Sequence, residues 1–493
     1  MLEVIEKAKI HSTRKAVLVE GKTHTYEEVL NKSRTLAFCL LNGSHDLDES
    51  RVALMIKPGA EYVAALWAIW QAGGVAVPLC LNHPPPALTH VLNDAGCKVL
   101  IVSPDYADVV SPLCKKMDIT VIILQSLPER AEQSLPEIDS TRRAMILYTS
   151  GTTNLPKGVV TTHKNIQAQI ATLVKAWRWS QQDHTLCILP LHHVHGIINV
   201  VSCSLWSGAL CEFLPEFDPT KVMGTFRKGN VNVFMAVPTI YFKLAAVWDQ
   251  MNPNSRSGIS EALNKMRLMV SGSAALPVSL MNKWQEISGH KLLERYGMTE
   301  LGMAISNPYS GERREGKVGI PLEGVLIRLC NEKDELVKDE PGEIQVKGEN
   351  VFLEYWNQPD ATRNAFTQDG WFRTGDVAVV EDGYYRIMGR NSVDIIKSGG
   401  YKISALEIEE TLRLHPMIKD CAVVGLDNEE WGEIVAAAIV SAEAPMKSED
   451  IQTWLKDRIP AYRVPRRYIF VDELPRNAMG KVTKNDVKKQ FSI

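Results

Sequence analysis

The chain has 493 residues, of which 45% are hydrophobic and 23% are charged. These proportions exclude a disordered or fibrous chain, and the length argues against a small binding module. Lys and Arg number 55 against 58 Asp and Glu, which gives a net charge of -3. Because the chain has no excess of positive charge to hold a polyanion, we expect no nucleic-acid partner.

The cysteines and the N-terminus bear on the cellular compartment. Nine cysteines are scattered along the chain without a C-x-x-C pair, which predicts reduced thiols in a cytosol-like compartment. The first residues contain no apolar signal segment, and Glu3 and Glu6 interrupt any acid-free targeting sequence. Two charge-free stretches, 63–81 and 185–211, contain Gly and Pro that suit a buried core better than a bilayer helix. We therefore expect a cytoplasmic protein with no membrane contact, although a processed organellar form would look the same.

Strand and helix patterns alternate along the first half of the chain. Residues 51–81 contain a short apolar run, a turn at Pro58 and Gly59, a helical stretch, a Gly-Gly stop and a second apolar run. Similar apolar runs recur at 98–103, 121–124, 144–150, 185–190, 233–238 and 267–273. Near-continuous apolar strands separated by helical lengths predict parallel sheets that are covered on both faces, and hence an α/β fold.

The pattern changes twice toward the C-terminus. Between residues 318 and 390 the strand spacing shortens, which predicts an antiparallel small β-barrel or sheet attached to the α/β body. After Arg390, ALEIEETLRLHP and SEDIQTWLKDRI have helical spacing, whereas CAVVGL and EIVAAAIVS resemble strands. We therefore expect two domains: residues 1–390, and a small α+β lid formed by residues 391–493.

The segment LYTSGTTNLPKG, residues 147–158, follows an apolar strand and is rich in hydroxyl side chains. Such a loop offers hydroxyls, backbone N–H groups and one mobile cation to a polyphosphate. It is not a Walker A loop, because G-x-x-x-x-G-K-[ST] cannot be aligned with GTTNLPKG. The residues expected to contact the phosphates are Thr149, Ser150, Gly151, Thr152, Thr153 and Lys157.

With this loop the sequence resembles the acyl-adenylate-forming superfamily, which includes acyl-CoA synthetases, luciferases and peptide-synthetase adenylation domains. The similarity extends from TYEEVLNKSRTLA near the start to LPRNAMGKV near the end. It implies an enzyme that uses ATP and Mg²⁺ to activate a carboxylic acid as an acyl-adenylate, followed by transfer to coenzyme A. One departure is Asn154, where the superfamily usually has Gly. Asn is the best non-Gly residue at positive φ, so we expect the turn to survive.

Two further motifs correspond to nucleotide-binding segments of the superfamily. In ERYGMTE the resemblance implies that Tyr296 flanks adenine, Thr299 touches the α-phosphate and Glu300 holds Mg²⁺, a hard cation that prefers oxygen ligands. In SGSAALP it implies that the purine lies against Gly272 and Ser273.

The end of WFRTGD and the following GR complete the expected nucleotide site. Asp376 can accept two hydrogen bonds from the ribose diol, and Arg390 offers donors to the same sugar or to a phosphate. Considered without the resemblance, the two residues could equally form a salt bridge at a domain boundary.

The C-terminal motifs imply a mobile domain. By resemblance, Lys481 of RNAMGKV bridges the developing adenylate, and the small domain then swings about Asp394 or its neighbours. The swing would bring a Ser-Gly-Gly loop to the acyl-adenylate, where the lack of side chains permits close approach of the pantetheine arm of CoA. That loop consists of Ser398, Gly399 and Gly400.

Arg295, inside ERYGMTE, is the most informative residue for the substrate. By resemblance it lies at the floor of the acyl pocket, where an unpaired guanidinium costs roughly 3 to 5 kcal/mol. A second carboxylate on the substrate would supply the counter-ion. The alternatives are a permanent pair with Glu294 or Glu300, or a guanidinium that faces solvent.

LPLHHVHG, residues 189–196, contains three histidines, but no further ligand completes a tetrahedral zinc set. His193 or His195, with Ser271, is instead expected to donate to a substrate carboxylate. These motifs together resemble the malonyl-CoA synthetases, which implies malonate as substrate, with methylmalonate only partly rejected. A short- or medium-chain acyl-CoA synthetase and a luciferase-type oxidase are the alternatives. Because the animal members of this family work in mitochondria, the mitochondrial matrix is the alternative location.

Overall fold

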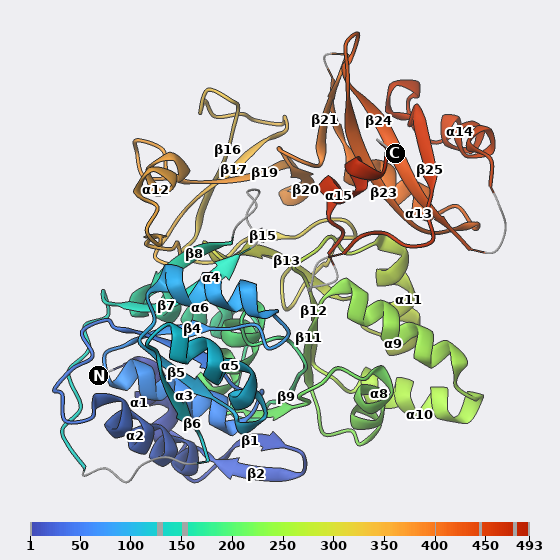
Figure 1. Cartoon of the computed structure of the whole chain (residues 1–493). Coiled ribbons are helices and arrows are strands. Elements are labelled where there is room, and N and C mark those ends of the chain that lie inside the picture. Colours follow the sequence, from blue (N-terminus) through green and yellow to red (C-terminus); the bar gives the residue numbers. More distant parts are fainter. Residues whose placement is uncertain are drawn as a thin grey trace.

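The structure is a computed structural model that describes residues 2–125, 132–149, 156–399, 401–442, 446–476 and 481–491. A large α/β body holds two sheets, and a small sheet and a C-terminal part lie at one end of it (Figure 1). The mixed α/β architecture with a smaller C-terminal part confirms the predicted fold class.

A nine-stranded sheet contains the later apolar runs. Its strands in spatial order are β15 (Ile320–Pro321), β14 (Gly302–Ser306), β13 (Leu293–Met298), β12 (Leu268–Ser271), β11 (Val233–Ala236), β9 (His184–Cys187), β10 (Leu210–Phe213), β1 (Lys15–Val19) and β2 (Lys22–Thr25). The strands from β13 to β1 run parallel, as predicted, whereas β14, β15 and β2 pair antiparallel at the edges.

A seven-stranded sheet contains the earlier runs. Its order is β18 (Glu354–Tyr355), β8 (Lys157–Thr162), β7 (Arg143–Thr149), β4 (Val75–Pro78), β3 (Arg51–Met55), β5 (Val99–Val102) and β6 (Thr120–Ile123). The strands from β7 to β6 are parallel, but β8 forms an antiparallel hairpin with β7 and pairs with β18.

One layer of helices is buried between the two sheets. It contains α1 (Glu3–Ile10), α2 (Tyr26–Leu41), α3 (Ala60–Gln71), α6 (His163–Ala176), the π-helix η1 (His195–Ser202) and α7 (Cys203–Trp206). Residues 60–70 of α3 are buried except for Glu61, as expected for a helix that is apolar on all sides. Both charge-free stretches therefore pass through this core. No helix in the described residues is long and apolar enough to cross a membrane.

Two outer layers of helices cover the remaining faces of the sheets. Alternate residues of a strand point to opposite faces, so Val233 of β11 enters the central core while Phe234 packs under the outer helices. The outer helices are α8 (Pro219–Arg227), α9 (Pro238–Gln250), α10 (Pro253–Asn264) and α11 (Val278–Ser288) on the larger sheet, and α4 (Pro85–Ala95) and α5 (Pro104–Lys116) on the smaller.

The predicted antiparallel segment forms a sheet and not a closed barrel. Its strands are β16 (Leu326–Cys330), β17 (Gly342–Lys347), β19 (Phe372–Glu381) and β20 (Tyr384–Arg390), and α12 (Pro359–Ala365) lies beside it. All of its pairings are antiparallel. Asp376 and Arg390 are paired across β19 and β20, which fixes one predicted nucleotide residue opposite another.

The C-terminal part has its own sheet and its own hydrophobic clusters. The sheet contains β22 (Tyr401–Ser404), β21 (Ile395–Ser398), β24 (Gly432–Ser441), β23 (Ile418–Asn428) and β25 (Arg467–Phe470). Its helical elements are α13 (Ala405–Arg413), α14 (Ser448–Lys456), the 3-10 turn η2 (Ala461–Arg463) and α15 (Lys484–Gln490). Helices α13 and α14 pack on one face and α15 on the other, so both faces of the sheet are covered.

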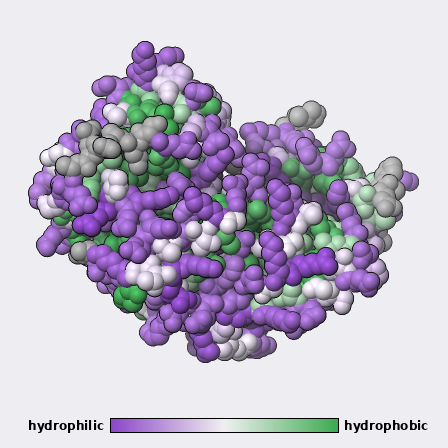
Figure 2. Space-filling model, turned by 90° about the horizontal axis from the view of Figure 1, so that it is seen from below, coloured by the Kyte–Doolittle hydropathy of each residue, from purple (hydrophilic) through white to green (hydrophobic). Residues whose placement is uncertain are grey.

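The surface seen from below in Figure 2 is mainly hydrophilic. Hydrophobic side chains reach this face only as small, separate groups, as is normal for a folded protein.

Candidate active site

The predicted phosphate loop joins the two strands of the β7–β8 hairpin. Thr149, the last residue of β7, is paired with Lys157, the first residue of β8. The pairing of the two strands therefore holds both ends of the loop side by side. Lys157 is half-buried. The other predicted loop residues and the departure at position 154 lie outside the described residues, namely Ser150, Gly151, Thr152, Thr153 and Asn154.

Lys157 and Glu300 are brought together by Tyr355, an aromatic residue of β18. The ammonium of Lys157 lies 5.5 Å from the centre of the Tyr355 ring, and the Tyr355 hydroxyl donates to Glu300 Oε1 at 3.0 Å. Because β18 pairs with β8, the ring is fixed beside the base of the phosphate loop. The predicted metal carboxylate and the predicted phosphate lysine therefore lie on either side of one tyrosine.

The turn between β13 and β14 presents Thr299 and Glu300. Glu300 is buried, and its carbonyl accepts the backbone N–H of Phe352 at 2.7 Å. The amide of Asn350 donates to the next carbonyl, that of Leu301, at 2.6 Å. Burial raises the pKa of Glu300, although the hydrogen bond from Tyr355 opposes this rise. Thr299, half-buried, precedes it on the same turn.

The donor set at Glu300 fits Mg²⁺ better than a softer metal. One carboxylate is available, and no described residues form a cluster of three or more His, Cys, Asp or Glu that could hold a metal. Mg²⁺ is commonly bound through one or two carboxylates plus the phosphates of its nucleotide. The residues present therefore suit a magnesium ion that arrives with ATP.

Tyr296, Asp376 and Arg390 form one hydrogen-bonded group. The Tyr296 hydroxyl donates to Asp376 Oδ2 at 2.6 Å, and Arg390 Nε donates to Asp376 Oδ1 at 2.9 Å. The salt bridge that the sequence left open is thus present. Each carboxylate oxygen retains capacity to accept a further hydrogen bond, so a contact with ribose is compatible with the salt bridge and stays a prediction.

Arg295 is buried with no counter-ion among the described residues. Its side chain lies on β13, and the residue is only 3% exposed. No acidic group in the described part of the chain forms an ion pair with it, and its Nε has no hydrogen-bond partner. Burial lowers the pKa of Arg295 to about 9, so the group is still a cation at neutral pH. Both alternatives considered for Arg295, a permanent acid partner and exposure to solvent, are therefore wrong.

Glu294 cannot serve as that partner, because it is an uncharged acid at neutral pH. It is 4% exposed, and its Oε1 accepts the backbone N–H of Leu276 at 3.0 Å. Burial raises the pKa of Glu294 to about 8. Adjacent residues of a strand point to opposite faces, which separates this carboxyl from the guanidinium of Arg295.

The guanidinium of Arg295 packs against the turn that follows β12. A Cβ atom added at Gly272 would lie 2.5 Å from Cζ and Nε of Arg295, so a larger residue there would require the guanidinium to move. Ser273 has a positive φ of 68°, and its hydroxyl lies 3.4 Å from Arg295 Nη2 and 3.2 Å from His195 Nδ1. Gly272 and Ser273 thus contact the predicted acyl-pocket arginine, while their contact with the purine stays a prediction.

Two buried polar atoms at Arg295 and at the nearby His195 have no partner within the described residues. They are Arg295 Nε and His195 Nε2. Ser271 Oγ is also unpartnered, but Ser271 pairs in register with Glu294, so its side chain lies on the opposite face of the sheet from Arg295. Burial, and then the charge of Arg295, hold the pKa of His195 well below its usual value, so the ring is neutral. An unpaired buried donor costs about 1 to 3 kcal/mol. This cost is offset when a bound ligand accepts a hydrogen bond from it. His195 and Arg295 thus each offer a buried, unpartnered polar atom near Ser273, while the binding of a substrate carboxylate by His195, Ser271 and Arg295 stays a prediction.

His193 has less structural support than His195 as a substrate-binding residue. It is half-buried, and its ring lies 4.0 Å from that of His192. Burial lowers the pKa of His193 to about 4. It is therefore neutral, and no contact connects it with Arg295, so its role in substrate binding stays a prediction.

The predicted CoA loop and the predicted hinge lie in and beside the hairpin β21–β22. Ser398 is buried at the end of β21, and Gly399 has a φ of 56° and donates its N–H to the carbonyl of Trp431 at 2.9 Å. Gly400 lies outside the described residues. Asp394 immediately precedes β21, and Lys481 is exposed just before α15.

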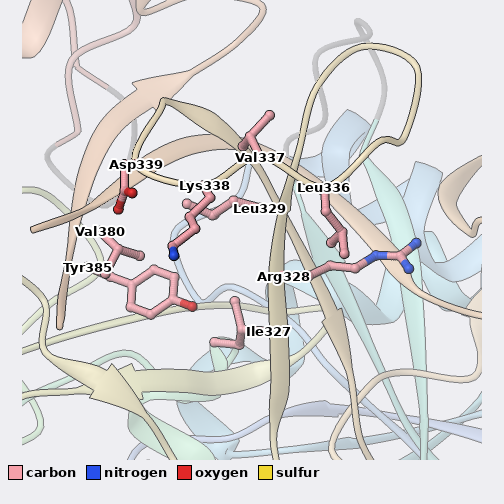
Figure 3. A pocket seen from close by; sticks show the side chains of 9 residues that line it. All are labelled: Ile327, Arg328, Leu329, Leu336, Val337, Lys338, Asp339, Val380 and Tyr385. Atoms are coloured by element: carbon pink, nitrogen blue, oxygen red, sulfur yellow. The ribbon is translucent and has the colours of Figure 1, made fainter.

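The pocket in Figure 3 contains none of the predicted site residues. It has a volume of about 460 Å³ and lies on the small antiparallel sheet. Its lining residues are Ile327, Arg328, Leu329, Leu336, Val337, Lys338, Asp339, Val380 and Tyr385. The guanidinium of Arg328 is already paired with Asp369 at 2.7 Å, so the pocket offers little chemistry.

Two residues of the site were missed by sequence reasoning. Tyr355 reaches Glu300 across 55 residues of chain, and no motif or spacing marks that contact. Asn199, one turn after His195 on η1, is fully buried with both amide atoms unpartnered within the described residues. The π-helix that carries it has no reliable sequence signal, although such segments often occur at functional sites.

Two protein-family descriptions match the chain. Residues 5–356 match the family described as AMP-binding enzyme, and residues 407–481 match its C-terminal domain. The first match spans more than half of the chain and contains the phosphate loop, Arg295 and Glu300.

Known malonate–CoA ligases are similar to this chain over almost all of its length. A mitochondrial malonate–CoA ligase of Homo sapiens is 42% identical and covers 99% of this chain and 92% of its own, and one of Xenopus laevis is 41% identical over 100% and 92%. Among solved structures, ATP-bound MatB from Rhodopseudomonas palustris superposes with a TM-score of 0.91 at 31% identity, covering 99% of both chains.

The raised pKa of Glu294 predicts a pH-dependent stability that Glu294→Gln removes. The folded state keeps a proton that the unfolded state releases above its ordinary pKa, so folding weakens as pH rises from about 4.5 to about 8. Over this interval the unfolding free energy of the wild type should fall by roughly 2 to 5 kcal/mol, whereas that of the variant should not. Urea unfolding of both proteins at several pH values measures this. Parallel pH profiles would contradict it.

Proposed function

Because the chain belongs to the AMP-binding enzyme family, we propose that it is an ATP-dependent malonate–CoA ligase. Malonate and ATP form malonyl-adenylate and pyrophosphate, and CoA then displaces AMP to give malonyl-CoA. The observation that carries the choice of acid is the buried Arg295, which has no acidic partner in the described part of the chain.

The charge on Arg295 favours a substrate with two carboxylates. One carboxylate reacts with ATP, and the other supplies the counter-ion, with His195 and Ser273 beside it as donors. Acetate would leave the guanidinium unpaired at a cost of roughly 3 to 5 kcal/mol. The malonate–CoA ligases among the relatives support this reading. Methylmalonate differs by one methyl group, which a pocket rejects only about 10- to 200-fold.

In the first half-reaction the protein stabilises the negative charge that gathers at the α-phosphorus. No general base is needed. A malonate oxygen attacks the α-phosphorus, the bond to the bridging oxygen breaks, and pyrophosphate leaves. Cations and N–H groups placed beforehand around the phosphates lower the barrier. We assign Lys157 and the loop residues to the leaving pyrophosphate, Thr299 to the α-phosphate and Lys481 to the forming adenylate. Glu300 would hold Mg²⁺, which neutralises phosphate charge.

The nucleotide itself is held by residues that already form one group. Tyr296 is assigned to the adenine, and Asp376 and Arg390 to the ribose and its phosphate. This assignment is supported by the hydrogen bonds that connect the three side chains.

The second half-reaction needs a different surface at the same site. The thiolate of CoA attacks the malonyl carbonyl carbon, and the bond to the AMP oxygen breaks. We propose that residues 391–493 act as a domain that turns about Asp394, withdraws Lys481 and presents the loop of Ser398, Gly399 and Gly400 to CoA. The separate hydrophobic clusters of the C-terminal part support its movement as one body.

The location is inferred from the relatives alone. The two vertebrate malonate–CoA ligases carry the word mitochondrial in their names, which supports the mitochondrial matrix over the cytoplasm. Fractionation of the source cells with an antibody to the protein decides between the two.

Arg295→Leu should collapse malonate turnover and relatively favour short monocarboxylates. The reason is the loss of the only cation expected at the far carboxylate, worth roughly a hundredfold to several-thousandfold in kcat/KM. The measurement is AMP release with malonate, methylmalonate, succinate, acetate and octanoate. Arg295→Lys, which keeps the charge but loses the planar fork, is the matched control and should retain a preference for dicarboxylates.

Two outcomes would decide against the malonate assignment. An unchanged ratio of malonate to acetate turnover in Arg295→Leu would remove the counter-ion role. A wild-type preference for octanoate would leave the ligase activity standing and make the enzyme a monocarboxylate acyl-CoA synthetase.

Gly272→Ala tests whether the packing of the Arg295 guanidinium against Gly272 matters for malonate binding. The added Cβ would lie 2.5 Å from Arg295 Nε, so the guanidinium must move. We expect the KM for malonate to rise about tenfold or more, since a displaced charge loses much of its pairing energy. Gly258→Ala, where nothing lies within 4 Å of the new atom, is the control. A rise in the KM for ATP alone would place the effect at the purine.

Lys481→Ala should abolish adenylate formation and largely spare the second half-reaction. Lys481 is assigned only to the first step, so conversion of supplied malonyl-adenylate and CoA to malonyl-CoA should continue. Pyrophosphate exchange measures the first step and thioester formation the second. Equal losses in the two assays would defeat the proposal that one site is used in two domain arrangements.

A further inference from the structure

A continuous line of contacts leads from the nucleotide residues to the C-terminal helix. It begins at Tyr296, whose hydroxyl donates to Asp376, and passes through the salt bridge of Asp376 with Arg390. The backbone N–H of Arg390 then donates to Asp394 Oδ2 at 3.0 Å. The line therefore reaches the proposed hinge through groups that are part of the nucleotide site.

The hinge carboxylate is engaged on both oxygens. Its Oδ1 lies 3.5 Å from the ammonium of Lys484, the first residue of α15, while Oδ2 accepts from Arg390. The carbonyl of Asp394 also accepts the N–H of Ala405 at 2.8 Å, at the start of α13. Asp394 is thus tied to the body on one side and to two helices of the C-terminal part on the other.

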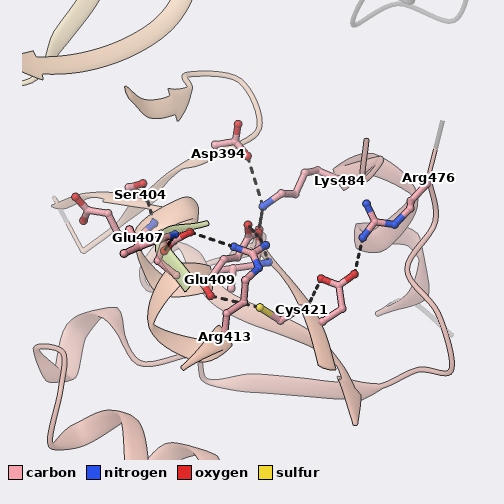
Figure 4. A network of polar contacts seen from close by, with 12 residues as sticks. Asp394, Ser404, Glu407, Glu409, Arg413, Cys421, Arg476 and Lys484 are labelled. Carbon is pink, nitrogen blue, oxygen red and sulfur yellow. Dashed lines mark hydrogen bonds and ion pairs between the residues drawn. The ribbon is translucent and has the colours of Figure 1, made fainter. Parts of the chain in front are cut away.

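Lys484 is a buried cation with three oxygen partners. Its side chain is 10% exposed, and its ammonium contacts the carboxylate of Glu409 and donates to the carbonyl of Val423 at 2.7 Å (Figure 4). Burial lowers the pKa of Lys484, but the charges of Glu409 and Asp394 outweigh burial and raise it, so the group stays charged. Two of its partners, Glu409 and Val423, belong to the C-terminal part, and only Asp394 lies at the junction.

The position of Lys484 limits where Lys481 can be. They are three positions apart, and a fully extended chain spans at most about 3.6 Å per residue, or about 11 Å here. With the Lys484 ammonium held at Asp394, the start of α15 is fixed beside the group of Arg390 and Asp376. The Cα of Lys481 can therefore lie no farther than about 11 Å from that of Lys484, whose ammonium contacts the hinge carboxylate next to Arg390.

We propose that Lys484 is a positioning residue for adenylate formation, whose ion pair with Asp394 holds the Lys481 segment at the nucleotide site and breaks when the C-terminal part turns. This inference rests on the proposed two-step function. Lys484 does not contact the reacting atoms and acts through the hinge.

A purely structural role is the competing explanation. Lys484 also balances Glu409, which is 4% exposed, and loss of a buried partner destabilises a fold. A structural role predicts that both half-reactions fall together with the amount of folded protein. The positioning role predicts that the first half-reaction falls alone.

The experiment compares Lys484→Met with Lys489→Met in the full-length protein. Lys489 lies on the same helix in an exposed pair with Asp486, so its substitution makes the same charge change without touching the hinge. We expect malonate-dependent pyrophosphate exchange to fall about ten- to hundredfold in Lys484→Met, the range for a lost charged hydrogen bond. Thioester formation from supplied malonyl-adenylate and CoA should be unchanged or faster, and Lys489→Met should match the wild type in both assays.

Asp394→Asn is the second variant, needed because Lys484→Met can fail to fold. The amide oxygen can still accept from Arg390, and the pair of Lys484 with Glu409 is untouched, while the ion pair at the hinge is lost. The same selective loss of pyrophosphate exchange is expected. The double variant should be no slower than the slower single variant, since both changes remove one interaction.

The outcomes separate this inference from the proposed function. Equal losses in both half-reactions, or no loss in either, would overturn the positioning role of Lys484. A wild-type protein that exchanges pyrophosphate with another acid but not with malonate would overturn only the substrate, and the comparison would then be made with that acid. A wild type that forms no adenylate with any acid would overturn the proposed function itself.

Discussion

The burial of one guanidinium, that of Arg295, is the constraint on which the proposed choice of a dicarboxylate depends. Arg295 lies on β13, is shielded from water and faces a neutral His195, while the adjacent acid, Glu294, keeps its proton and points to the opposite face of the strand. A cation in such a place is stable only if a partner arrives with the substrate. The surrounding sequence meets this need with glycine at position 272, which leaves room for the side chain.

The arrangement of strands explains how distant residues meet around the substrates. β13 supplies Arg295 and Tyr296 on successive positions, so one points toward Ser273 and the other toward Asp376. The turn that follows presents Glu300, and β18 brings Tyr355 across to it. The two sheets therefore converge on one edge, where acid, nucleotide and metal would be held together.

The fold and the motifs could be predicted from the sequence, but the contacts between them could not. The apolar runs identified the strands, and the composition of the phosphate loop and the charge of Arg295 indicated the chemistry. The hairpin after β7 was not anticipated, because an antiparallel strand with the same apolar character interrupts the parallel pattern. The partner of Glu300 and the burial of Lys484 were also missed, since side-chain contacts over long separations leave no periodic signal. In the basic segment KVTKNDVKKQF nothing distinguishes the one buried lysine from its solvated neighbours.

The β7–β8 hairpin has a consequence for variation among enzymes of this kind. Thr149 and Lys157 are anchored by strands on both outer sides, β4 next to β7 and β18 next to β8. Insertions or deletions between them would alter the length of the connecting segment without displacing either anchor, because closing a somewhat longer loop costs little. The proposed contacts with the leaving pyrophosphate can therefore be changed by evolution or by engineering while the paired strands β7 and β8 stay the same.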